Sequence, residues 1–242
     1  MNTHAKKIAT GAPVDQGLPK AILCIHGAGS SGDIFRIQLA KISTALKHEF
    51  DFVFANGPHV SSPGPGVLPW FKDAGPYYSW FKEEETTMNR RVEQVGDAVK
   101  SALKQWDSTK KNPDARVVGV IAFSEGALSA TLLLWQQKMT RLPWLPTLHF
   151  AALFCCYFRR EAAEYMASDL EDGEKPVIKV QTLHVHARQD FCLAGARRLV
   201  ANHFSPGYAQ VIEFDGTHHV PIKHEDVDKT VKHILLLSKA VS

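Results

Sequence analysis

The apolar residues of this chain gather in short runs with few polar interruptions, and such runs predict buried strands. Six segments have this pattern: 21–25, 52–55, 117–123, 148–154, 180–186 and 209–214. Runs of this kind, rich in branched and aromatic side chains, are typical of strands covered on both faces of a parallel sheet. We therefore expect a sheet of about six strands.

Segments with helical spacing of apolar positions lie between these runs. They are 34–46, 92–106, 127–139, 193–203 and 227–237. Strands that alternate with helices in this way predict a mostly parallel, doubly wound α/β sheet with helices on both faces. The chain shows neither an internal repeat nor a dividing linker. We expect residues 1–242 to form a single domain, with 1–19 as a flexible lead-in.

Two insertions interrupt the alternation of strands and helices. Residues 57–80 hold five prolines and four glycines, and residues 141–147 form a shorter proline-containing segment. Long connections without regular structure are often functional lids, although both segments could equally be ordered surface loops that pack their own aromatic residues. We expect them to cover a substrate pocket, with four aromatic side chains as its wall: Trp70, Tyr78, Trp80 and Trp144.

Composition and charge exclude several classes of protein. The chain has 242 residues with 28 Lys and Arg against 25 Asp and Glu, and its basic residues are scattered in short dyads. This distribution differs from the clustered basic residues of a nucleic-acid-binding surface. The longest apolar stretch, near 148–158, is too short to span a bilayer, and the first residues lack the apolar core of a signal peptide. We expect a cytoplasmic protein with reduced cysteines and no contact with a membrane.

The residues 122–126, Ala-Phe-Ser-Glu-Gly, carry the strongest chemical signal. They follow a predicted strand and open a predicted helix, as in the nucleophile elbow Gly-x-Ser-x-Gly, with alanine at the first position. The small residues at the two ends allow a tight turn that raises the serine oxygen above the sheet. This pattern predicts Ser124 as a nucleophile and the Glu125 N–H as a donor to an oxyanion.

A nucleophilic serine needs a histidine base and an acid that orients it, in the chain order serine, acid, histidine for this kind of sheet. Asp190 follows the predicted strand 180–186, and His218 follows the strand 209–214. Asp215 is the rival acid, but it lies at the end of the strand that also positions His218. The neighbouring His219 is expected at the edge of the pocket.

The first predicted strand ends in His26-Gly-Ala-Gly, a turn that can supply the second oxyanion donor. The Ala28 N–H is our candidate, and His26 is expected to have a structural role. Residues 27–32 also match Gly-x-Gly-x-x-Gly, so an NAD(P)-binding oxidoreductase is an alternative. That alternative lacks an acid at the end of the second strand, where Asn56 stands. Histidine pairs occur without a complete ligand set, so we expect neither a metal nor a cofactor.

Three segments together resemble the fungal FSH-type serine hydrolases, which have the α/β-hydrolase fold: 23–29, 119–127 and 216–221. The resemblance implies a catalytic triad of Ser124, Asp190 and His218, with oxyanion donors at Ala28 and Glu125. The chain departs from the usual family pattern by Ala122 and Ala187 in place of glycine and by Thr217 in place of a second glycine. These departures affect the expected pocket and substrate rather than the triad.

The same resemblance, which is strongest to polyketide-releasing members of the family, implies the substrate and the partner. It implies hydrolysis of an acyl thioester on the acyl carrier domain of a highly reducing polyketide synthase, which frees a polyketide acid. The residues themselves indicate only a serine acyl hydrolase with an apolar, aromatic-rich pocket. A carboxylesterase that acts on a free small-molecule ester and a non-catalytic binding protein are the alternatives.

Overall fold

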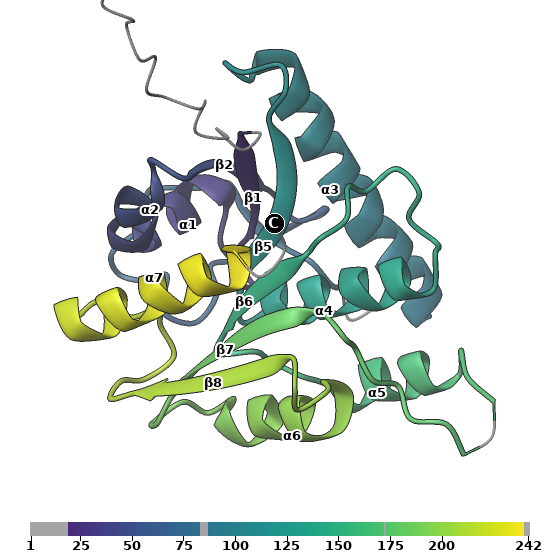
Figure 1. The fold of residues 1–242 in the computed structure, drawn as a ribbon. Helices are drawn as coiled ribbons and strands as arrows, with labels where there is room; N and C mark the ends of the chain where they lie inside the picture. The colour runs from purple at the N-terminus through teal and green to yellow at the C-terminus, as the bar shows by residue number, and fades with distance from the viewer. Residues whose placement is uncertain (1–18, 83–86, 172, 240–242) are drawn as a thin grey trace, which may run out of the picture.

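A six-stranded sheet in which all neighbouring strands are parallel forms the centre of the computed structural model (Figure 1). The structure describes residues 19–82, 87–171 and 173–239. Across the sheet, the strands run in the order β2 (Phe50–Ala55), β1 (Lys20–Ile25), β5 (Arg116–Phe123), β6 (Phe150–Phe154), β7 (Gln181–Ala187) and β8 (Ala209–Phe214). The predicted parallel α/β sheet is confirmed.

Helices cover both faces of this sheet, as the alternating pattern predicts. One face carries α1 (Gly32–Gln38), α2 (Ala40–Leu46) and α7 (His224–Lys239). The other carries α3 (Met88–Thr109), α4 (Glu125–Lys138), α5 (Arg160–Ala167) and α6 (Leu193–His203). No helix in these described ranges is long and apolar enough to cross a bilayer.

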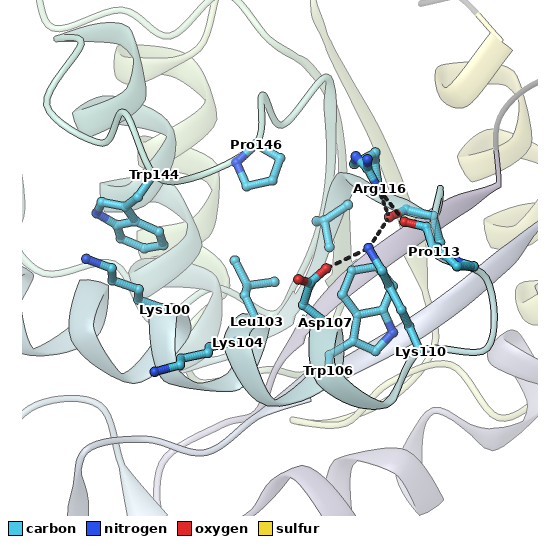
Figure 2. Close-up of a pocket in the computed structure, with 12 residues that line it drawn as sticks. Lys100, Leu103, Lys104, Trp106, Asp107, Lys110, Pro113, Arg116, Trp144 and Pro146 are labelled. Atoms are coloured by element: carbon cyan, nitrogen blue, oxygen red, sulfur yellow. Dashed lines mark hydrogen bonds and ion pairs between the residues drawn. The ribbon is translucent and has the colours of Figure 1, made fainter.

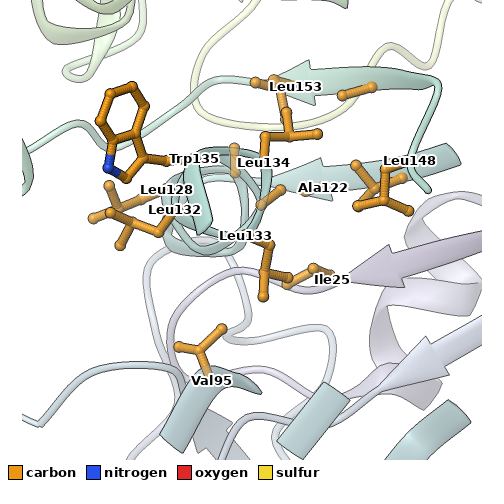
Figure 3. Close-up of a cluster of buried hydrophobic side chains, with 14 of the residues drawn as sticks. Ile25, Val95, Ala122, Leu128, Leu132, Leu133, Leu134, Trp135, Leu148 and Leu153 are labelled. Carbon is orange, nitrogen blue, oxygen red and sulfur yellow. The ribbon is translucent and has the colours of Figure 1, made fainter. Parts of the chain in front are cut away.

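Helix α4 lies inside the protein and fixes the position of the residue that precedes it, Ser124. Every residue from Glu125 to Gln136 is buried, because α4 packs between the sheet and the helices α3 and α5. Figure 3 shows the leucines of α4 pointing in several directions, with Ile25 and Val95 on one side and Leu153 on another. A helix that is apolar on all sides needs such surroundings. Its rigid placement gives the elbow a fixed base.

The structure differs from the predicted elements at three places. The segment predicted as one helix over 34–46 is two helices, which meet at the buried Leu39 with φ −88° and ψ −1°. The short helix α5 was not predicted, because its eight residues span little more than two turns. Within the 57–80 insertion, β3 (His59–Ser61) and β4 (Tyr77–Ser79) pair antiparallel. The predicted lead-in 1–19 lies, except for its last residue, outside the described residues.

The two insertions lie at opposite edges of the sheet. The 57–80 insertion follows the carboxyl end of β2, which is the edge that also holds Ser124 after β5. The 141–147 insertion follows α4, whose 14 residues lead about 21 Å away from Ser124, and it precedes the amino end of β6. It therefore does not cover a pocket at Ser124, contrary to our expectation. Segments that run from a helix to the next parallel strand lie at the edge opposite to the carboxyl ends of the strands.

Candidate active site

Ser124 occupies a sharp turn between β5 and α4. Its backbone has φ 56° and ψ −118°, a conformation that is uncommon for residues other than glycine. The turn brings the helix against β1 so closely that a Cβ at Gly126 would lie 2.3 Å from the carbonyl oxygen of His26. A Cβ at Gly27 would lie 2.9 Å from the ring of Phe123. The two glycines thus allow the tight turn that raises the Ser124 hydroxyl above the sheet.

A continuous chain of hydrogen bonds joins Ser124, His218 and Asp190. The Oγ of Ser124 lies 2.8 Å from Nε2 of His218, and Nδ1 of His218 lies 2.9 Å from Oδ1 of Asp190. All three side chains come from loops at the carboxyl ends of β5, β7 and β8, which meet at one edge of the sheet. Serine and aspartate are buried, with 7% and 8% of their surface exposed. The structure therefore brings together the three residues of the predicted triad.

The carboxylate of Asp190 is buried and accepts hydrogen bonds from two neighbouring groups. Its Oδ1 also accepts a hydrogen bond of 2.8 Å from the Cys192 amide. Burial alone would raise the pKa of Asp190, but the hydrogen bonds from His218 and from that amide outweigh burial and keep the pKa below its usual value. The carboxyl group is consequently ionised at neutral pH, as an acid that orients an imidazolium requires.

Two aromatic rings enclose the imidazole of His218. The ring of Phe123 lies 4.8 Å and the ring of Phe191 lies 4.5 Å from it, measured between centroids. Phe123 belongs to β5, and Phe191 directly follows Asp190. These two ring contacts restrict rotation of the imidazole, whose nitrogens bond to Ser124 and Asp190.

The pocket beside Ser124 is small. It has a volume of about 20 Å³, which is room for about one water molecule, and Ala28 and Gly27 form one wall. Among the described residues, neither the Ala28 amide nor the Glu125 amide donates a hydrogen bond to another protein group. Glu125 is the first residue of α4, where amide groups have no partner within the helix and the helix dipole favours negative charge. No described residue thus occupies either amide, as the predicted role of both as oxyanion donors requires.

The 57–80 insertion forms the roof of the pocket. Pro65 and Val67 line it, and the Gly64 amide donates a hydrogen bond of 2.9 Å to the carbonyl of Gly29. A Cβ on Gly29 would lie 2.0 Å from the backbone nitrogen of Gly64, so the two segments are in direct contact. This contact also removes the space that a pyrophosphate would need over the Gly-x-Gly-x-x-Gly turn. The dinucleotide alternative is inconsistent with this packing.

His26 stabilises the base of the insertion. Its Nε2 accepts a hydrogen bond of 3.0 Å from the Gly57 amide, and its carbonyl accepts one of 2.8 Å from the indole of Trp80. Burial lowers the pKa of His26 to about 4, so the ring is neutral and suited to accept the Gly57 hydrogen bond. These contacts agree with the structural role expected for His26.

The structure places the expected pocket residues elsewhere. Trp80 is fully buried beneath the site, and Trp70 is 84% exposed. Tyr78 pairs through its backbone with Ser30. Of the described residues that line the pocket at Ser124, none belongs to the expected set of Trp70, Tyr78, Trp80, Trp144 and His219.

Trp144 and His219 have other surroundings. Trp144 lies against α3, where Lys100 Nζ is 5.8 Å from the indole centroid, in a different pocket (Figure 2). The ring of His219 contacts Phe214 at 5.4 Å between centroids, and its Nδ1 lies 2.7 Å from the Val220 carbonyl oxygen. Neither side chain therefore contributes to the wall beside Ser124.

Several residues at the site were not found by sequence reasoning. Pro65, Val67 and Gln38 line the pocket, and Phe191 flanks His218. Pro65 and Val67 belong to the 57–80 insertion that was expected to cover the pocket, but no motif marks these two residues or Gln38. The position of Phe191 next to Asp190 could have indicated it. Cys155 was also missed: its Sγ lies within 4.8 Å of side-chain atoms of both Asp190 and His218.

Cys155, Asp190 and His218 form the one group of three potential metal ligands among the described residues. The aspartate and the histidine of this group already bond to each other at 2.9 Å, and the histidine bonds to Ser124. This geometry fits proton transfer to and from a serine, and it uses no metal ligand set. Fold and site together define a serine hydrolase of the α/β type.

Comparison with known proteins identifies the family. The family model described as Serine hydrolase (FSH1) matches residues 18–230. The esterase mlcF of Penicillium citrinum is 48% identical over 231 residues, which cover 92% of this chain and 91% of that protein. This chain belongs to the FSH1 serine hydrolase family, as the motifs of the sequence had indicated.

Two further proteins, one related in sequence and one similar in fold, resemble this chain. A dihydromonacolin L-[lovastatin nonaketide synthase] thioesterase of Aspergillus terreus is 44% identical over 242 residues, covering 92% of this chain and 94% of that protein. The crystal structure of Zea mays acyl-protein thioesterase 2 has a TM-score of 0.52 and 18% identity, covering 92% of this chain and 95% of that one. The plant structure supports the fold alone, whereas the fungal relative shares enough sequence to bear on the chemistry.

Proposed function

We propose that this serine hydrolase is a thioesterase that cleaves an acyl thioester on the acyl carrier domain of a polyketide synthase and frees the acid. The observation that carries the proposal is the hydrogen-bonded series Ser124, His218 and Asp190, with distances of 2.8 and 2.9 Å. The choice of a carrier-bound substrate is supported by the relative that is 44% identical, which is named as a thioesterase acting on lovastatin nonaketide synthase.

In the first half of the reaction, Ser124 Oγ attacks the thioester carbonyl while Nε2 of His218 takes its proton. The carbonyl oxygen becomes an oxyanion, which the amides of Ala28 and Glu125 stabilise by hydrogen bonds. The ionised Asp190 holds the Nδ1 proton of His218 and stabilises the imidazolium that forms. The intermediate collapses with cleavage of the carbon–sulfur bond, and the imidazolium gives its proton to the departing sulfur.

In the second half, a water molecule attacks the acyl ester on Ser124 while His218 takes a proton from it. The same two amides stabilise the second oxyanion. Collapse breaks the bond to Ser124 Oγ, which recovers its proton from His218, and the carboxylic acid leaves. One water molecule is consumed, and one acid and one thiol are formed. No redox partner is needed.

The size of the pocket limits what can bind without movement. A volume of about 20 Å³ accommodates one water molecule but not an acyl chain. Pro65 and Val67 form the roof, so a long acyl group has to displace this part of the 57–80 insertion. Each methylene that is then buried contributes about 0.8 kcal/mol, which favours long chains over acetyl.

The deciding experiment compares the same acyl group on two leaving groups. We expect purified protein to release free octanoate from an octanoyl-loaded acyl carrier domain at least about tenfold faster than from ethyl octanoate at equal concentration. Ser124→Ala should release none from either. The names of relatives such as esterase mlcF favour the alternative of a free ester substrate. Rapid ester hydrolysis without release from the carrier would establish that alternative and overturn the thioesterase assignment.

A further inference from the structure

A second pocket, much larger than the one at Ser124, lies far from the catalytic serine. It has a volume of about 750 Å³ and lies between the carboxyl end of α3, the start of β5 and the 144–146 segment (Figure 2). Strand β5 separates it from the catalytic serine, because Val117 at the pocket and Ser124 are about 23 Å apart along the strand. A volume of this size is within the range of small-molecule sites.

Cations outnumber anions around this pocket. Lys100, Lys104, Lys110 and Arg116 line it, together with a single carboxylate, Asp107. This local excess of three positive charges equals the formal net charge of the whole chain, +3, so the charges elsewhere balance. The pocket is thus a region of local positive charge.

Only part of this charge is compensated. Lys110 Nζ bonds to Asp107 at 2.6 Å, and the lysine side chain is only 8% exposed. Lys100 and Lys104 make no ion pair with another described residue, and both are exposed. They are four residues apart on α3, so they lie on the same side of the helix. Two ammonium groups on residues one helical turn apart, neither paired with a described carboxylate, are suited to bind a carboxylate.

Apolar surface lies next to these ammonium groups. The half-buried indoles of Trp106 and Trp144 line the pocket with Leu103 and Val117, and Figure 2 shows the indoles on opposite sides of it. Lys110 Nζ lies 5.1 Å from the centroid of Trp106. A ligand that fills the space must therefore combine an apolar body with a negative end.

We propose that this pocket is a binding site for a carboxylic acid with an extended apolar body. Lys100 and Lys104 bind the carboxylate, and the indoles of Trp106 and Trp144 cover the apolar part. An acid of this class is also what a serine hydrolase releases from a long acyl substrate, so the pocket can hold product away from Ser124. The ligand chemistry follows from the pocket itself and does not depend on whether the substrate is a thioester.

The five tryptophans of the chain provide separate reporters for a test with decanoate as the probe. In spectra of the 15N-labelled protein, each indole N–H gives its own signal, assigned by single Trp→Phe variants. We expect decanoate to shift the signals of Trp106 and Trp144, and decanol or acetate to shift them much less at equal concentration. The Trp80 indole bonds to His26 beneath the catalytic site and reports on binding there.

Two matched variants test the role of the lysines. Lys100→Gln combined with Lys104→Gln should weaken decanoate binding about fivefold or more at low salt, since two exposed charge pairs are removed. Lys229→Gln combined with Lys232→Gln removes the same charge from α7 on the other face and should change binding less than about twofold. The proposal is wrong if decanoate shifts only Trp80, if decanol binds as well as decanoate, or if both double variants weaken binding equally. None of these readouts requires turnover, so the result is independent of the proposed function.

Discussion

The backbone N–H of Trp80 donates a hydrogen bond of 2.8 Å to Oε2 of Glu125, the residue that follows Ser124. This bond joins the end of the 57–80 insertion to the start of the helix behind the nucleophile. Burial raises the pKa of Glu125 above its usual value, although hydrogen bonds from the amides of Trp80 and Phe81 oppose that shift. The Glu125 side chain therefore connects the end of the 57–80 insertion to the first turn of α4.

We expect Glu125→Ala to loosen this connection. The substitution leaves buried amides without an acceptor, which costs about 1–3 kcal/mol. The free energy of unfolding in urea should fall by that amount, and kcat should fall as the roof and elbow lose their alignment. Glu125→Gln retains one amide acceptor and should cost less than half as much. Equal stability of the wild type and Glu125→Ala would show that the bond does not hold the insertion.

Cys155 gives a second prediction, because its thiol lies behind the triad. It follows β6 with φ 48°, and its Sγ lies 3.5 Å from the His219 carbonyl. Nearby, the buried Oδ2 of Asp190 has no hydrogen-bond partner among the described residues. Burial raises the pKa of the thiol, so it keeps its proton and can turn it toward that oxygen.

Cys155→Ala should therefore lower kcat about 3- to 10-fold with little change in KM, because a thiol is a weak donor and contributes less than the roughly 1.5–3 kcal/mol of an ordinary hydrogen bond to a charged group. Cys155→Ser should restore most of the rate, because the hydroxyl can donate as the thiol does. Cys156→Ala is the control, since Cys156 packs in the apolar cluster around α4. Steady-state kinetics of the three variants decide the matter. An unchanged kcat in Cys155→Ala would exclude a role in orienting Asp190.

A substitution at Val67 tests whether the 57–80 insertion lies over the acyl group of the substrate. The Val67 side chain is 2% exposed and lines the small space at Ser124. Val67→Ala removes two methyl groups from that roof, and we expect the ratio of kcat/KM for octanoyl over acetyl thioesters to rise at least about threefold. Val60→Ala is the matched control in the same insertion, because Val60 is 77% exposed. A ratio that does not change, or changes equally in both variants, would place the acyl group elsewhere.

Buried histidines predict the pH dependence of stability. Burial lowers the pKa of His26 to about 4 and that of His184 to about 3, so both stay neutral in the fold when the unfolded chain binds protons. In the unfolded chain a histidine has a pKa of about 6.5. The free energy of unfolding is therefore highest above that pH and decreases as the pH falls below it, because protons then bind to the unfolded chain and not to the fold. By pH 5, the loss is roughly 2 kcal/mol for each of the two.

Urea unfolding at pH 7, 6 and 5 measures this loss. His184→Gln should be less stable than the wild type at pH 7, but its free energy of unfolding should fall less steeply toward pH 5. A His233→Gln variant changes an exposed ring on α7 and should keep the slope of the wild type. A free energy of unfolding that does not change between pH 7 and 5 would contradict the prediction.

The strands and the three residues of the hydrogen-bonded series could be predicted because they depend on local pattern and on chain order. The six strands of the central sheet overlap the predicted runs, and Ser124, Asp190 and His218 each lie within four residues of the end of a strand. In a parallel sheet, the carboxyl ends of strands meet at one edge, so their proximity follows from topology.

The pocket wall could not be predicted, because aromatic residues serve the core and a binding site equally well. Trp80 is fully buried, and Trp144 lies on the opposite edge of the sheet from Ser124. Pro65 and Val67, which do line the site, belong to no recognisable motif. The contact between their segment and Gly29 depends on the tertiary fold and cannot be read from local sequence. The edge to which 141–147 belongs could have been derived from the order of strand and helix alone.

Transfer of the acyl group to Ser124 Oγ before hydrolysis is the central step, and mass spectrometry of the acylated protein tests it most directly. The protein is mixed with an octanoyl-loaded acyl carrier domain, quenched in acid within the first turnover and digested. We predict an octanoyl group on the peptide that contains Ser124, its disappearance as free octanoate accumulates, and neither event in Ser124→Ala. An octanoyl group on Cys155, Cys156 or Cys192 instead, or free octanoate formed at the wild-type rate by Ser124→Ala, would contradict the account.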